Sequence, residues 1–295
     1  LEVKLAREMG FCYGVRRALR LLNEASQQYG QIQTLGHIVH NEQVVENLSK
    51  KGISPVESIA DINSHFVAVT THGIGPKVLA ELESRSLQIV DTTCPWVSRE
   101  QKAAKRLAEA GFSVIIFGDA DHPEVKGVLE WAGSGGRVTQ TPSLEHLYTQ
   151  SPRRLGILSQ TTQNPQAFKY FVNKLIDGFL SSGIEIRIIN TICDATQKRQ
   201  AAAIELASAV DSMIVVGGKG SANTRRLAEI CQARGVATHQ VETFKDLQTL
   251  WFEGKYRVGI TAGASTPDEV IQDVMYKLKN LEVGTSCSTT NSAFI

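Results

Sequence analysis

The chain has 295 residues, of which 42% are hydrophobic and 21% charged, which excludes a disordered or fibrous protein and leaves room for two or three domains. Its 31 basic and 30 acidic side chains leave a formal charge of +1, which argues against nucleic acid or a membrane surface as a partner. The apolar runs have the length of strands and fall short of the roughly 20 residues that a membrane span needs.

The start of the chain and its cysteine count together predict a reducing, cytoplasmic location. Residues 1–10 contain acidic side chains and lack the apolar stretch of a secretory signal. Five cysteines, an odd number in a long chain, argue against a disulfide framework. Metal binding or catalysis is the expected use of some of them.

A first unit begins at Cys12, which opens a basic amphipathic stretch typical of a helix. An apolar strand at 32–35 follows, and the loop after that strand carries His40. A second apolar strand ends beside His72, and Pro76 marks the start of another helix, where a missing N–H costs little. The alternation of helices and strands predicts parallel sheets.

A second unit repeats this order from Cys94, with a basic helix and then an apolar strand at 114–117. The loop after that strand carries His122. The loop after the next apolar strand carries Thr161, the counterpart of the second histidine of the first unit, and Pro165 again begins a helix. Loops after strand C-termini are where parallel sheets place ligands.

The third unit begins at Cys193 and has its first apolar strand at 213–216. Ser221 follows that strand, and Ser265 and Pro267 follow the second one. The glycines before Ser221 do not form a Walker loop, because the order G-x-x-x-x-G-K-[ST] is absent.

The spacing is the same in all three units. The cysteine and the first loop residue are 28 positions apart, as positions 12 and 40, 94 and 122, and 193 and 221 show. Such repetition predicts an α/β fold of three similar βα domains with small parallel sheets around a shared centre. The expected units are residues 1–95, 96–191 and 192–281, followed by a C-terminal tail at 282–295.

Three cysteines stand at equivalent positions near helix starts: Cys12, Cys94 and Cys193. If they converge, they offer three thiolates to one metal centre, and helix N-termini favour the ionised thiol. Thiolates bind iron–sulfur clusters, and three of them would leave one iron open, although the spacing alone leaves zinc as an alternative. Cys231, on an apolar helix face, and Cys287, in the tail, are expected to serve no metal.

Polar residues in the loops form a second candidate set: His40, His72, His122, Ser221, Asn223 and Ser265. Such donors, with loop N–H groups ahead of helices, can bind a phosphate without a large net charge. Glu124 stands two residues after His122 and can deliver a proton to a departing hydroxyl group, and Thr161 can orient the Glu124 carboxylate. Taken alone, Glu124 is more simply an acid that favours a helix N-terminus.

The motifs that carry these residues follow one another along residues 1–280: Gly10-Phe-Cys-Tyr-Gly-Val15, Thr71-His-Gly73, Asp91-Thr-Thr-Cys-Pro95, His122-Pro-Glu124, Gln160-Thr-Thr162, Asn190-Thr-Ile-Cys193 and Thr261-Ala-Gly-Ala-Ser265. Together they resemble the 4-hydroxy-3-methylbut-2-enyl diphosphate reductases, the IspH or LytB family. The resemblance implies a pseudo-threefold trefoil around a [4Fe-4S] cluster that has three cysteine ligands and one open iron. It also implies the reaction, a two-electron reductive dehydroxylation that yields isopentenyl and dimethylallyl diphosphates in the last step of the non-mevalonate (MEP) pathway.

The resemblance also assigns roles to individual residues. The metal ligands are Cys12, Cys94 and Cys193; the catalytic residues are Glu124, Thr161 and His122; the substrate-binding residues are His40, His72, His122, Thr161, Ser221, Ala222, Asn223 and Ser265. A ferredoxin or flavodoxin is the implied electron donor. Ala222 is a departure, because many members have a serine there, and it removes a hydrogen bond worth on the order of 1 kcal/mol. The tail matches no family feature.

Three other hypotheses fit parts of the pattern. A non-redox [4Fe-4S] dehydratase also uses an open iron but transfers no net electrons. A redox-gated anion-binding protein would hold a labile cluster without turning over the diphosphate. A structural zinc protein would be colourless and have four closed ligands. Dependence on a reductant and turnover of the diphosphate separate these classes from a reductase.

Overall fold

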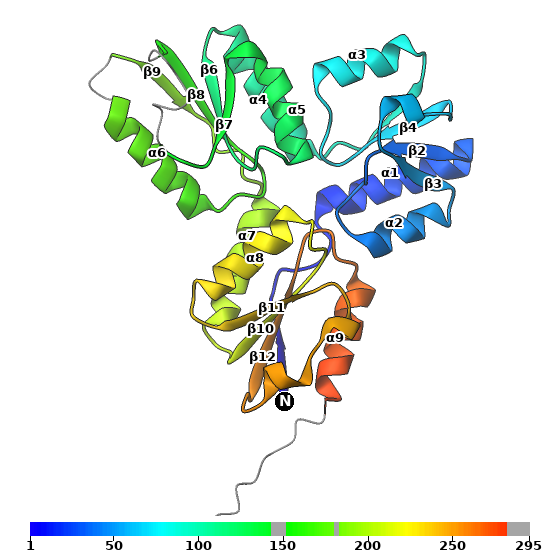
Figure 1. Ribbon diagram of the computed structural model, residues 1–295, viewed down its shortest axis with the longest axis vertical. Helices are drawn as coiled ribbons and strands as arrows, with labels where there is room; N and C mark the ends of the chain where they lie inside the picture. Colours follow the sequence, from blue (N-terminus) through cyan, green and yellow to red (C-terminus); the bar gives the residue numbers. More distant parts are fainter. Residues whose placement is uncertain (143–151, 180–182, 282–295) are drawn as a thin grey trace, which may run out of the picture.

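Three lobes of similar build surround the centre of the molecule (Figure 1). The structure is a computed structural model that describes residues 1–142, 152–179 and 183–281. Each lobe contains one four-stranded sheet, and every strand pair is parallel. The predicted α/β fold of three similar parallel sheets in a threefold arrangement is confirmed.

The three sheets have equivalent strand orders, β3-β2-β4-β5, β7-β6-β8-β9 and β11-β10-β12-β1. The first lobe comprises β2 (Ile32–Leu35), β3 (Ile53–Val56), β4 (Phe66–Val69), β5 (Gln88–Asp91), α1 (Tyr13–Tyr29), α2 (Glu42–Ser49) and α3 (Pro76–Ser84). The second comprises β6 (Ser113–Phe117), β7 (Gly136–Thr139), β8 (Arg154–Ser159), β9 (Glu185–Ile188), α4 (Pro95–Glu109), α5 (Pro123–Ala132) and α6 (Pro165–Phe179). The third comprises β1 (Glu2–Leu5), β10 (Ser212–Val216), β11 (Ala237–Val241), β12 (Arg257–Ala262), α7 (Asp194–Ala207), α8 (Ala222–Gln232) and α9 (Asp268–Lys279).

The alternation of side chains along the central strands builds a core on both faces of each sheet. In β6, Val114 and Ile116 pack with residues of α4 and α5, whereas Ile115 and Phe117 pack with residues of α6. Successive strand residues point to opposite faces, so continuous apolar runs of this kind are typical of parallel sheets that are covered on both sides. Within the described ranges, no helix has both the length and the apolar character needed to cross a membrane.

The chain passes from the edge strand of one lobe directly into the first helix of the next. β5 leads through Cys94 into α4, β9 leads through Cys193 into α7, and β1 leads through Cys12 into α1. Each cysteine therefore occupies a crossing between two lobes. The equal spacing found in the sequence reflects this repeated strand–cysteine–helix connection.

The first strand differs from the division expected from the sequence, which placed residues 1–95 together. Glu2–Leu5 pair with Arg257–Ile260 of β12, so the start of the chain supplies the edge strand of the third sheet. In the other two lobes β5 and β9 fill this position. The pairing joins residues some 250 positions apart, which local sequence patterns do not reveal. The boundaries after residues 95, 191 and 281 stay predictions, and the tail lies outside the described residues.

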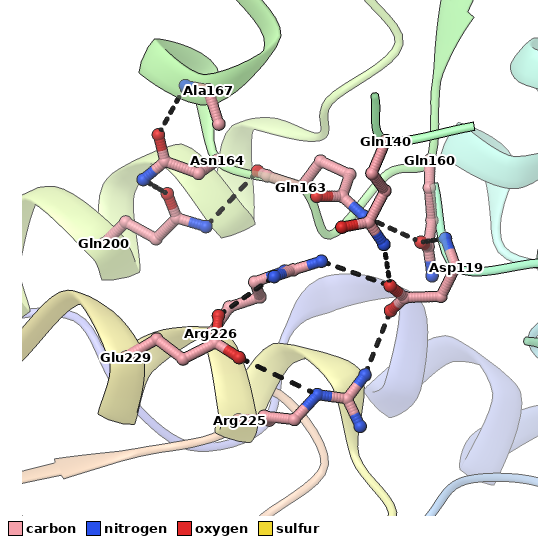
Figure 2. Close-up of polar contacts among 10 residues, drawn as sticks. All are labelled: Asp119, Gln140, Gln160, Gln163, Asn164, Ala167, Gln200, Arg225, Arg226 and Glu229. Atoms are coloured by element: carbon pink, nitrogen blue, oxygen red, sulfur yellow. Dashed lines mark hydrogen bonds and ion pairs between the residues drawn. The ribbon is translucent and has the colours of Figure 1, made fainter. Parts of the chain in front are cut away.

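A cluster of ion pairs joins the second and third lobes (Figure 2). Asp119, in the loop after β6, accepts hydrogen bonds from Arg225 Nη2 at 3.0 Å and from Arg226 Nη2 at 3.2 Å, both on α8. Glu229 accepts from Arg226 Nη1 at 2.9 Å and keeps that guanidinium in place. The cluster holds the loop that leads to His122 against the helix that begins after Ser221.

Candidate active site at the lobe junction

A cavity of about 110 Å³ lies where the three lobes meet. The site residues expected from the sequence all line it: Cys12, Cys94, Cys193, His40, His72, His122, Glu124, Thr161, Ser221, Ala222, Asn223 and Ser265. They come from the three cysteine crossings and from the loops at the carboxyl ends of the strands. The convergence places thiols, imidazoles, hydroxyls, an amide and one carboxyl group around a single space.

The local fold turns the cysteines toward this space, because each is the N-cap of the helix that follows it. The Cys12 thiol accepts a hydrogen bond from the Val15 N–H at 3.5 Å, and the Cys193 thiol accepts one from the Thr196 N–H at 3.3 Å. Cys94 makes no such cap bond. All three sulfurs thus sit at the positive ends of helix dipoles, which favour thiolates.

Gly14 shows how closely two of the sulfurs approach the backbone. A Cβ at this position would lie 2.6 Å from Cys94 Sγ and 3.8 Å from Cys12 Sγ. A side chain here would collide with the Cys94 thiol and would be in van der Waals contact with the Cys12 thiol. Three thiols around a space that a glycine keeps open fit a soft metal centre such as an iron–sulfur cluster.

The thiols of Cys94 and Cys193 are protonated at neutral pH in the protein alone. Burial raises the pKa of Cys94 from 9.0 to about 11, and burial also raises the pKa of Cys193. A cation would compensate for the lost hydration, so metal binding at this site releases protons. Cys231 lies elsewhere, fully buried in the core of the third lobe, as expected from its apolar helix face. Cys287 lies outside the described residues.

Three histidines form one wall of the cavity. The ring centroids of His40 and His72 are 4.8 Å apart, those of His72 and His122 are 5.1 Å apart, and those of His40 and His122 are 5.7 Å apart. His40 and His72 come from the first lobe and His122 from the second, at the start of α5. A single small anion can reach all three rings.

The histidines are neutral in the free protein. Burial, followed by the neighbouring imidazoles, lowers the pKa of His40 from 6.5 to about 4 and that of His72 well below 6.5. Burial also lowers the pKa of His122. Because His122 Nδ1 accepts a hydrogen bond from the Glu124 N–H at 3.2 Å, its proton lies on Nε2, where it can be donated to a ligand.

The third lobe contributes the N-terminus of α8 and a group of buried polar atoms. Ser221 is the N-cap of α8, and its Oγ accepts from the Thr224 N–H at 3.4 Å. His40 Nε2, both amide atoms of Asn223 and Ser265 Oγ are buried without a hydrogen-bond partner in the described part of the chain. Buried polar atoms are rarely left unpaired in folded proteins, so these atoms are groups that a ligand would satisfy.

Glu124 is the carboxyl group of the cavity and is only 2% exposed. Its Oε1 accepts from the Thr161 N–H at 2.7 Å, and its Oε2 accepts from the Thr161 hydroxyl at 3.0 Å. Both carboxylate oxygens are therefore fixed by the loop after β8. The arrangement orients Glu124 for proton transfer within the cavity.

Two residues at or beside this site, Gly14 and Glu100, were not predicted from the sequence. Gly14 belongs to the motif around Cys12, but the motif alone assigns it no role. Glu100 lies on α4, is 0% exposed, and interacts with Glu124. Helical spacing gives a signal for it, because Val97, Glu100 and Ala104 fall on one face of α4, and Val97 and Ala104 are buried.

Comparison with known proteins gives a consistent result. Residues 3–279 match the model of the family described as LytB protein. The 4-hydroxy-3-methylbut-2-enyl diphosphate reductase of Dehalococcoides mccartyi (strain CBDB1) is 48% identical over 284 residues, which cover 96% of this chain and 100% of the relative. The reductase of the same name from Geobacter metallireducens is 41% identical over 283 residues, covering 96% of this chain and 98% of the relative.

Solved structures agree. The E-1-hydroxy-2-methyl-but-2-enyl-4-diphosphate reductase from Plasmodium falciparum matches with a TM-score of 0.90 and 27% identity, covering 96% of this chain and 89% of that one. A structure of (E)-4-hydroxy-3-methyl-but-2-enyl diphosphate reductase, described as the terminal enzyme of the non-mevalonate pathway, matches with a TM-score of 0.68 and 38% identity, covering 95% of this chain and 100% of that one. The chain belongs to the LytB protein family.

Proposed function

We propose that this protein is a 4-hydroxy-3-methylbut-2-enyl diphosphate reductase. Two electrons and two protons convert the allylic alcohol into isopentenyl or dimethylallyl diphosphate, with the C–O bond broken and the oxygen released as water. The observation that carries the proposal is the meeting of three thiols, a set of unpaired anion-binding groups and one oriented carboxyl group in a single cavity.

Cys12, Cys94 and Cys193 would hold a [4Fe-4S] cluster through three thiolates, leaving one iron without a protein ligand. When bound, the cluster supplies the electrons and a Lewis-acidic iron. The chain's own part is to bring the three sulfurs together at helix starts and to keep the neighbouring space clear through Gly14.

The diphosphate would be bound by the three histidines together with the polar groups of the third lobe. His40, His72 and His122 offer ring N–H donors, and Ser221, Asn223 and Ser265 offer hydroxyl and amide groups beside the N-terminus of α8. Ala222 contributes its backbone N–H at the first turn of that helix, and no side-chain donor. The diphosphate anchors the allyl group so that the hydroxyl end is held in place.

Glu124 would deliver the proton to the departing hydroxyl oxygen. Thr161 fixes both oxygens of the carboxyl group, and its hydroxyl would also orient the substrate hydroxyl. His122 caps α5, the helix that carries Glu124, because its Nδ1 accepts a hydrogen bond from the Glu124 N–H. A positioned acid of this kind contributes about 10²-fold to 10⁴-fold to a rate.

The electron donor would be a small acidic redox protein such as a ferredoxin or flavodoxin. A surface hollow of about 670 Å³ is lined by five basic residues and two acidic ones: Arg17, Arg99, Lys102, Lys105, Arg106, Asp91 and Glu109. Thr93 and Pro95, the two neighbours of Cys94, also line it. This basic hollow would attract an acidic partner and bring it against the backbone on either side of a cluster ligand.

The test uses anaerobically purified protein with reconstituted cluster. We expect about four irons for each chain and consumption of the hydroxylated diphosphate only when a reductant is supplied. Glu124→Gln is expected to keep the iron content and the substrate affinity while kcat falls by about 10²-fold or more. Consumption without reductant would indicate a dehydratase, and binding without turnover an anion-binding protein; either result refutes the proposed function.

A further inference from the structure

A second carboxyl group lies behind the catalytic one. Glu100 projects from the buried face of α4, is 0% exposed, and has no conventional hydrogen-bond partner on either oxygen among the described residues. Buried carboxyl groups without a partner are rare, because burying one as a charge is very unfavourable. An acid at this position therefore needs an explanation beyond packing.

The neighbouring carboxyl group is Glu124. α4 packs against α5, which carries Glu124 in its first turn. Burial, then the charge of Glu124 and hydrogen bonding to it, raises the pKa of Glu100 well above its usual 4.5. The protonated form of Glu100 is therefore favoured, and its O–H group would face the Glu124 carboxyl group.

The other elements packed against α4 supply no competing charge. β6 carries no titratable side chain, and on β8 only Arg154 is charged. The Arg154 guanidinium bonds the Ala110 carbonyl and Glu185 at the far end of α4. On α5, the remaining charged side chains are Lys126, which is exposed, and Glu130, which lies against Gly75. Glu124 is thus the charged group that Glu100 faces within the described ranges.

We propose that Glu100 is a positioning residue that stays protonated and donates its O–H to the Glu124 carboxylate. The Thr161 N–H and hydroxyl already donate hydrogen bonds to the Glu124 carboxylate, and Glu100 would add a third donor from α4. Hydrogen bonds in an active site often tighten only in the substrate complex, so the Glu100 contact is expected to shorten there. A neutral acid kept as a donor in an apolar site is an established device for stabilising an anion.

The inference rests on the proposed role of Glu124 and leaves the reaction balance unchanged. Glu124 gives one proton to the departing oxygen, which leaves as water when two electrons from the reductant break the C–O bond. The second proton of the reaction, taken from solvent, adds to the allyl carbon. The carboxylate that remains on Glu124 is stabilised by the Glu100 O–H, which keeps its own proton throughout. Water that enters after product release returns a proton to Glu124.

The test compares Glu100→Gln, which keeps a donor, with Glu100→Met, which has similar length and no donor. Glu83→Gln, at an exposed position on α3, is the control for removal of a carboxyl group. Iron content and Tm are measured first. We expect Glu100→Met to lower kcat about tenfold at unchanged KM and to move the alkaline limb of the kcat profile up by about one pH unit. Glu100→Gln should leave both within about twofold to threefold.

Infrared spectroscopy gives a result that does not depend on turnover. The holoenzyme at neutral pH should show the C=O band of a protonated carboxyl group that is lost in both Glu100 variants and kept in Glu83→Gln. Absence of that band overturns the inference. An unchanged pH profile of kcat in Glu100→Met also overturns the inference. A downward shift of the alkaline limb in both variants overturns it as well, because such a shift would mean that Glu100 is ionised. If the wild-type protein has the band and no reductase activity, the proposed function fails and the protonation of Glu100 stands.

Discussion

Replacing Glu100 with glutamine is expected to change how stability depends on pH. In the unfolded chain Glu100 titrates near 4.5, whereas in the folded protein burial and Glu124 hold its pKa well above that value. Between these two pKa values the folded state keeps a proton that the unfolded state has released. The free energy of unfolding of the wild-type protein therefore falls as the pH rises through this window.

One proton corresponds to a slope of about 1.4 kcal/mol for each pH unit. Glutamine is neutral at every pH and removes this contribution, so Glu100→Gln should gain stability relative to wild type by about that amount for each pH unit above 4.5. Below the unfolded pKa the two proteins should differ only by the constant cost of repacking.

Urea unfolding of both proteins over a series of pH values measures the difference, and Glu83→Gln, at an exposed position on α3, again serves as the control. The same unfolding transition must be followed in each protein, because cluster loss can precede unfolding. A difference between Glu100→Gln and wild type that is constant with pH, or that shrinks as the pH rises, would show that the buried acid is not held neutral.

Three further predictions address the cluster, the anion site and the donor surface. Gly14→Ala should lower the iron content measured after reconstitution, because the new Cβ meets Cys94 Sγ. Gly178→Ala is the control, because its new Cβ has open space around it and the iron content should stay unchanged. An equal loss of iron in both variants would contradict the role of Gly14. Pyrophosphate binding at about pH 6 should be accompanied by proton uptake, because burial lowers the pKa of His40 to about 4 in the free protein and a bound anion raises that pKa. The affinity for pyrophosphate should therefore rise as the pH falls. Calorimetry in two buffers of different ionisation enthalpy measures the uptake, and finding none would refute the prediction. Lys102→Glu should lower the turnover rate with an acidic protein donor about tenfold at low salt. The turnover rate with a small neutral reductant should stay unchanged. Equal losses with the two reductants would place Lys102 outside the donor surface.

The repeat made much of the site predictable from the sequence. Cys12, Cys94 and Cys193 could be selected because equal positions in equivalent units must lie at equivalent places around a common axis. The repeat likewise predicts that the loop histidines and serines lie at the carboxyl ends of parallel strands, where ligands bind. Symmetry carried information about distance that no single motif contains.

Other features depend on contacts that symmetry does not dictate. The pairing of β1 with β12 joins residues some 250 positions apart, and the contact of Asp119 with Arg225 and Arg226 joins two different lobes. Glu100 has a visible helical spacing, but a single acid on an apolar face gains meaning only when Glu124 is seen beside it. These features arise from packing between units, whereas the repeat describes each unit by itself.

The pairing of β1 with β12 also places β1 beside α9, although nearly the whole described chain separates these two elements in sequence. β1, β5 and β9 take the same place in their sheets, so α9 and β1 correspond to α3 and β5 in the first lobe and to α6 and β9 in the second. A circular permutant that joins α9 to β1 and starts instead at β5 would keep every sheet and all three cysteine crossings. Its ability to bind iron would show that the centre is specified by the ring of connections and not by the order in which the lobes are synthesised.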